Sequence, residues 1–178
     1  MLALAPAMGS AARGAGIIVD HAGSHLEIAV KSTIDPFVAT LRDFEAAVEL
    51  SPDGGQIRTA VFRCKFNAIQ TGNPDRDHDM NDWQHTEDFP DVSFALTELT
   101  PGPAGRTLAH GRLRLHGVEK SVSFPVSVDL TKPVATIDGD VTLDTRDYGL
   151  PVIRKYLVLK VDPIVVVHFH LQGKRDIP

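Results

Sequence analysis

Two histidines near the C-terminal end of the sequence are the side chains best spaced for chemistry. His168 and His170 are separated by one residue, so on an extended strand they lie on the same face, roughly 7 Å apart. Two imidazoles at that spacing can bind one metal ion. We favour the other interpretation, in which Val167 and Phe169 fill the core and both histidines lie on the outer face beside solvent. The alternative function is a metal- or haem-associated accessory protein of a redox system, bound through His168 and His170.

No catalytic motif accompanies these histidines. The sequence contains no phosphate-binding loop, Gly-x-Ser-x-Gly elbow, His-Glu-x-x-His motif or dinucleotide fingerprint. The single cysteine, Cys64, excludes an internal disulfide and a cysteine-based zinc site. Its neighbours in sequence offer no base that would activate a thiolate. We therefore predict that the protein is not an enzyme, that it has no catalytic residues and that it needs no cofactor.

A dense turn cluster, Thr71–Asp77, carries the other candidate polar site. Arg76, with Asp77 and Asp79, can form a polar clamp that fixes this loop, and Asn or Asp can cap a following helix. Arg76 can instead contact an anionic head group at the mouth of a cavity. We favour the structural role and keep Arg76 as the best candidate for a polar ligand contact.

Alternation of apolar and polar residues indicates the elements that position these side chains. Eight stretches have the period of two that is typical of half-buried strands, and Pro163 is expected to bend the last one. One helix is expected in the longest gap, over 79–88, with Met80 and Trp83 on one face. The eight predicted strands cover 24–31, 38–50, 57–68, 92–99, 106–116, 121–130, 135–145 and 156–171.

Eight antiparallel strands with one apolar face each form a sandwich or a barrel. A barrel leaves no exposed edge, and eight strands give a lumen wide enough for one small ligand. Several inward positions are small (Ala46, Ala60, Cys64 and Gly139), and that pattern permits an open, apolar lumen. Met80, Trp83 and Arg76 are expected at its mouth. The residues expected to line the lumen are Phe44, Ala46, Val48, Ala60, Phe62, Cys64, Phe66, Phe94, Leu113, Leu115, Val126, Val128, Val141, Leu143, Val167 and Phe169.

Length and charge exclude several classes of protein. A chain of 178 residues fits one domain, which we place at 20–178. Residues 1–19 are expected to be a disordered tail or the remnant of a signal peptide, because they begin with a short apolar, Ala-rich stretch without a basic start. A net charge of −5 disfavours nucleic-acid binding. No stretch is long and apolar enough to span a bilayer, so no stable membrane insertion is expected.

Several short segments give the chain a family resemblance. They are Thr71-Gly72-Asn73 with Arg76-Asp77, Phe89 to Phe94, Gly111 to Lys120, and Arg146 to Leu150. Together they resemble the YceI-like family of polyisoprenoid-binding proteins, over about residues 20–171.

The resemblance implies an all-β, lipocalin-like barrel of eight antiparallel strands, with one short helix covering an end. It also implies a function: non-enzymatic binding or carriage of a long-chain hydrophobic ligand (a polyisoprenoid, a quinone, or a fatty amide or acid) in the lumen. Many members of the family are exported, so a periplasmic or secreted protein is expected, with the cytoplasm as the alternative. The expected partner is a small hydrophobic ligand, and a homodimer is possible.

Overall fold

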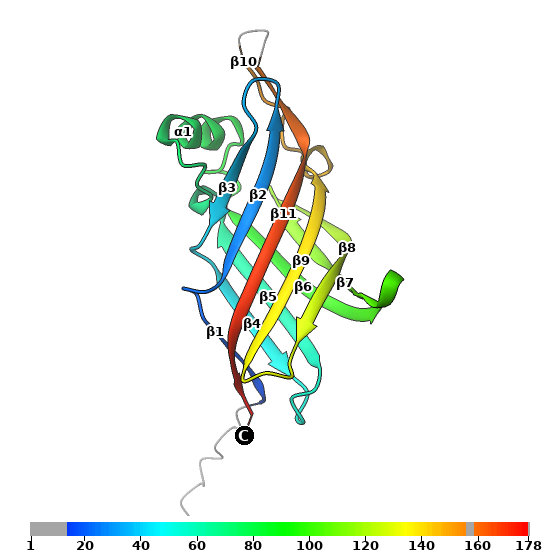
Figure 1. Cartoon of the computed structure of the whole chain (residues 1–178). Helices are drawn as coiled ribbons and strands as arrows, with labels where there is room; N and C mark the ends of the chain where they lie inside the picture. The colour runs from blue at the N-terminus through cyan, green and yellow to red at the C-terminus, as the bar shows by residue number, and fades with distance from the viewer. Residues whose placement is uncertain (1–13, 156–158, 178) are drawn as a thin grey trace, which may run out of the picture.

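A computed structural model describes residues 14–155 and 159–177 as a β-barrel with a short helix at one end (Figure 1). Residues 1–13 of the predicted tail lie outside the described residues. Residues 156–158 of the last predicted strand do so as well. The helical elements are α1 (Pro74–Trp83) and the 3-10 turns η1 (Phe66–Ala68), η2 (Pro103–Gly105) and η3 (Thr145–Tyr148). The strands are β1 (Gly16–Val19), β2 (His25–Ser32), β3 (Phe37–Leu41), β4 (Glu45–Leu50), β5 (Ile57–Lys65), β6 (Asp91–Pro101), β7 (Thr107–Leu115), β8 (Val118–Asp129), β9 (Val134–Asp144), β10 (Arg154–Lys155) and β11 (Leu159–Asp176).

These strands fill eight positions around a closed antiparallel barrel. β1 and β2 both pair with β11, one after the other along the same edge. β4 pairs with β1 and β3 pairs with β2, so β3 and β4 also share one position. The remaining neighbours follow chain order from β4 through β9 to β11. The predicted eight-stranded antiparallel barrel is confirmed.

The barrel begins earlier than the sequence predicted. β1, Gly16–Val19, lies within the residues assigned to the tail, yet it pairs with both β4 and β11 and closes the barrel. Its Ile17 and the neighbouring Ala15 pack against Val48 and Leu50 at the end of the barrel away from α1. The tail prediction was wrong for these residues, because a strand of four residues beside an Ala-rich stretch has too short an alternation to recognise.

The predicted strand over 38–50 is interrupted at residues 42–44. Cavity-facing residues in β3 have odd numbers (Ala39 and Leu41), whereas those in β4 have even numbers (Ala46 and Val48). The interruption therefore shifts the alternation by one residue. A single alternation of inward and outward side chains therefore does not describe the whole segment 38–50.

The helix also lies earlier than the predicted 79–88. The Asn73 side chain accepts hydrogen bonds from the backbone N–H groups of Asp75 and Arg76, at 3.0 and 3.1 Å, and Pro74 occupies the first helical position. This is a strong helix start. α1 ends at Trp83, so Met80 and Trp83 remain on the helix as predicted.

Proline bends the last strand at the predicted place. The register of β11 against β2 shifts between Val161 and Val165, on either side of Pro163. No helix in the described part of the chain is long and apolar enough to cross a membrane.

Candidate ligand-binding cavity

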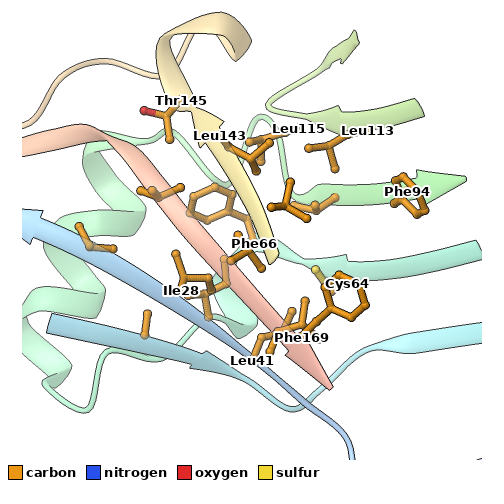
Figure 2. A pocket seen from close by; sticks show the side chains of 18 of the residues that line it. Ile28, Leu41, Cys64, Phe66, Phe94, Leu113, Leu115, Leu143, Thr145 and Phe169 are labelled. Atoms are coloured by element: carbon orange, nitrogen blue, oxygen red, sulfur yellow. The ribbon is translucent and has the colours of Figure 1, made fainter. Parts of the chain in front are cut away.

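The barrel encloses a cavity of about 610 Å³. Its wall is made almost entirely of aliphatic and aromatic side chains from every position around the barrel, and Figure 2 shows several of them, including Ile28, Phe66 and Leu115, converging on this space. Lining residues on β11 run from Val161 to Leu171, which is about 33 Å of strand at the usual rise per residue. The space is therefore elongated, apolar and of a size typical of ligand pockets.

The sequence-predicted lumen residues lie on this wall with one exception. The residues that do line the cavity are Ala46, Val48, Ala60, Phe62, Cys64, Phe66, Phe94, Leu113, Leu115, Val126, Val128, Val141, Leu143, Val167 and Phe169. The predicted mouth residues Arg76, Met80 and Trp83 line it as well.

Phe44 is the exception. It is not among the lining residues, although it is 5% exposed. Its ring packs 5.1 Å from the ring of His21 and 5.3 Å from that of Phe62, measured between centroids. Phe44 belongs to the interruption between β3 and β4, so its side chain supports the wall beside Phe62.

Three parts of the wall have no member in the predicted set. β2 and β3 contribute a continuous apolar strip, and the segment after η3 adds residues close to the mouth. The β2 strip was visible as an alternation in the sequence, whereas the β3 strip was hidden by the shift in alternation at 42–44. In these three parts the missed residues are Leu26, Ile28, Val30, Phe37, Ala39, Leu41, Leu150, Pro151, Val152 and Ile153. On the other strands the predicted set also omitted lining residues such as Ile57, Val92, Leu96, Val122, Phe124, Ile137 and Leu171.

Small residues on the inward face do not all create space. A side chain at Gly139 would begin 2.5 Å from the ring of Phe169, so this glycine makes room for that ring rather than for a ligand. Ala46 and Ala60, by contrast, both face the cavity.

Cys64 lies on the cavity wall in an unreactive environment. Burial, with a smaller contribution from the charge of Asp43, raises the pKa of its thiol to about 12. The thiol is therefore protonated at neutral pH and acts as a small apolar side chain.

The mouth of the cavity lies beside α1. Arg76 extends its guanidinium over the ring of Phe37, 4.3 Å from the centroid, and its Nη2 lies 3.7 Å from Asp35 Oδ2. The clamp on the loop is made instead by Asp77, whose Oδ1 accepts hydrogen bonds from the Thr71 N–H and hydroxyl at 2.8 and 2.6 Å. Arg76 therefore joins α1 to the β2–β3 loop across the mouth.

The two histidines of the alternative hypothesis lie on the outer face of β11. His168 Nδ1 is 2.5 Å from Asp140 Oδ1, and His170 Nδ1 is 2.6 Å from Asp138 Oδ1. The hydrogen bond to Asp138 raises the pKa of His170. Within residues 14–155 and 159–177, no group of three or more His, Cys, Asp or Glu side chains could hold a metal ion.

The turn between β7 and β8 supports the helix end. His116 Nε2 lies 3.0 Å from the Gln84 carbonyl oxygen, and the His116 ring packs on Phe89 with centroids 4.3 Å apart. Arg112 and Arg114, which precede His116 on the same face of β7, are exposed. His116 is partly covered, because the loop after α1 folds over the turn.

The sequence profile of the YceI-like domain matches residues 18–173. The chain belongs to the YceI-like family. The matched residues begin at the end of β1 and stop three residues before the end of β11. The family assignment and the barrel fold therefore describe the same part of the chain.

Three solved structures share this fold at low sequence identity. BcnA of Burkholderia cenocepacia is 20% identical with a TM-score of 0.75, over 88% of this chain and 99% of that one. A polyisoprenoid-binding domain from Saccharophagus degradans, implicated in plant cell wall breakdown, is 18% identical with a TM-score of 0.68, over 93% and 99%. The YceI protein of Campylobacter jejuni is 13% identical with a TM-score of 0.68, over 80% and 87%. No curated protein matches the chain.

Proposed function

We propose that this YceI-like protein binds one long-chain hydrophobic molecule in its barrel and carries it without changing it chemically. The ligand classes are a polyisoprenoid, a quinone, or a fatty amide or acid. The observation that carries the proposal is the elongated apolar cavity of about 610 Å³. The polyisoprenoid-binding domain among the similar structures supports it.

Burial of apolar surface is the driving force for holding such a ligand. Each methylene transferred from water contributes about 0.8 kcal/mol, so ten buried methylenes supply about 8 kcal/mol before the cost of immobilisation. The elongated wall along β11 accommodates a chain of that length. No reacting group is required, and the protonated thiol of Cys64 is unsuited to nucleophilic attack.

The metal- or haem-associated alternative has no specific observation in its favour. His168 and His170 each face a carboxylate of β9 on the outer face, away from the cavity. Export to the periplasm or secretion stays a prediction, as does a homodimer.

Mass spectrometry of an organic extract of the purified protein tests the proposal. We expect a co-purifying long-chain lipid or quinone, and saturable binding of geranylgeraniol when it is added. Trp83 provides the signal, because it is the single tryptophan of the sequence and lines the cavity. An extract without such a molecule, together with no binding of added chains, would reject the carrier function.

A further inference from the structure

The apolar wall of the cavity continues onto the surface of the protein at the mouth. Ile34, on the loop between β2 and β3, lines the cavity and is also 64% exposed. Pro151, which follows η3, is another lining residue that is exposed. At the opposite end the barrel is closed by a packed cluster that includes Val48, Leu50 and Ile137. A single exposed aliphatic side chain is ordinary, but one that continues an apolar cavity wall marks a contact surface.

The loop that carries Ile34 is held in place at the mouth. The Thr33 N–H donates to the Lys160 carbonyl oxygen, and the Lys160 N–H donates to the Thr33 hydroxyl oxygen, both at 3.1 Å. Within the loop, the Asp35 N–H donates to the Ser32 hydroxyl oxygen at 3.0 Å. Figure 1 shows the β2–β3 loop and β10 extending past the other strands, with α1 set back beside them. This loop and the described residues of the β10–β11 hairpin therefore form the tip of the mouth.

The tip carries two cations without an ionic partner. Arg154 on β10 lies directly opposite Lys160 on β11. Both residues are exposed, and neither forms an ion pair within residues 14–155 and 159–177. Like charges directly opposite each other on a sheet repel and weaken the pairing of the strands. An anionic surface in front of the tip would offset this repulsion.

The carboxylates of the mouth are paired or lie away from the tip. Asp35 Oδ2 lies 3.7 Å from Arg76 Nη2, and Asp162 Oδ1 accepts a backbone hydrogen bond at 2.9 Å. Asp75 and Asp79 belong to α1, which is set back from the tip (Figure 1). Exposed charges are screened over about 8 Å at physiological ionic strength. The net charge of −5 therefore does not set the potential at the tip.

We propose that the mouth end of the barrel docks reversibly on an anionic lipid bilayer. Ile34 enters the interfacial layer of the bilayer, and Arg154 and Lys160 contact lipid phosphates. The lumen then opens toward the membrane. The choice of a bilayer over a protein partner rests on the proposed function, because a long apolar chain that leaves the lumen needs an apolar phase to enter.

Flotation of the purified protein with vesicles, without added ligand, tests the docking. We expect binding to vesicles of equal parts phosphatidylcholine and phosphatidylglycerol, weaker binding to phosphatidylcholine alone, and loss of this difference at high salt. Ile34→Glu is expected to lower partitioning at least about tenfold, because aliphatic burial is lost and a carboxylate is added. The matched control is Ile18→Glu, since Ile18 is 63% exposed but lies on β1 at the opposite end. It is expected to leave partitioning unchanged.

Charge reversal tests the cations of the tip. Arg154→Glu is expected to lower partitioning to the mixed vesicles about thirtyfold, because one attraction is removed and one repulsion is added. Arg58→Glu makes the same change in net charge on an exposed residue of β5, at the end away from the mouth. It is expected to bind as the wild type does. Thermal unfolding of all four variants checks that they are folded.

Docking and carriage fail in different ways. If the wild type floats with neither kind of vesicle, or if Ile34→Glu and Ile18→Glu bind alike, docking at the mouth is wrong and the extraction test of the carrier function is unaffected. If the wild type binds no vesicle but self-associates in light scattering through a contact that Ile34→Glu abolishes, the tip is an interface between two copies and the proposal is wrong. If vesicle binding follows the expected pattern but no long chain binds the lumen, docking stands and the carrier function fails.

Discussion

Filling the cavity at one wall position provides a direct test of lumen binding. Ala46 and Ala47 are neighbours on β4, but Ala46 lines the cavity whereas Ala47 is exposed on the outer face. The change Ala46→Phe places an aromatic ring in the lumen opposite Phe62, its partner on β5. Ala47→Phe adds the same ring on the outside and is the matched control.

The expected effect follows from the carbon atoms displaced. The new ring takes the place of about six methylenes of a bound chain, and at about 0.8 kcal/mol each the lost burial approaches 5 kcal/mol. The affinity for geranylgeraniol is then expected to fall by up to about 3,000-fold. Fluorescence titration of Trp83 measures it, and thermal unfolding of both variants checks their folding. Equal affinities of the two folded variants would refute binding in the lumen.

Three further changes test the helix start, the outer histidine and the cysteine. Asn73→Ala removes the cap of α1 and is expected to lower the free energy of unfolding by about 1 kcal/mol in urea titrations; no change would exclude the cap as a stabilising contact. The raised pKa of His170 means that its pair with Asp138 stabilises the fold fully below its ordinary pKa of about 6.5, and that this contribution is lost as pH rises through the raised value. Melting temperatures of wild type and Asp138→Asn should therefore converge at alkaline pH, and a gap independent of pH would contradict this. Cys64, with its pKa raised to about 12, should react with thiol reagents much faster in urea than in the native protein, and equal rates would show an accessible thiolate.

The predicted lumen residues other than Phe44 lie on the cavity wall because a barrel converts alternation directly into inside and outside. The positions of Val126 and Val128 on β8, and of Val167 and Phe169 on β11, follow from the period of two and a closed sheet alone. The bend at Pro163 was equally visible, since proline cannot continue a ladder.

Features that depend on contacts between distant segments were not visible in the sequence. The interruption before Glu45 reverses the alternation, and nothing local to Phe44 shows that its ring packs beside the wall. The start of α1, by contrast, could have been predicted from the sequence. Asn73 followed by Pro74 is a recognisable helix start, and it is a stronger signal than the spacing of Met80 and Trp83.

The pairing of β11 with β1 and β2 has a consequence for folding kinetics. The hydroxyl of Ser24, which precedes β2, donates to the Gln172 carbonyl oxygen across 148 residues of sequence. Contacts between residues so far apart in sequence form slowly. Closing the long intervening loop costs chain entropy before the contacts can offset that cost. Until β11 is in place, β9 and β2 are unpaired edges that can associate with other chains. Aggregation during refolding should therefore compete with this last docking step, at a rate that rises with protein concentration.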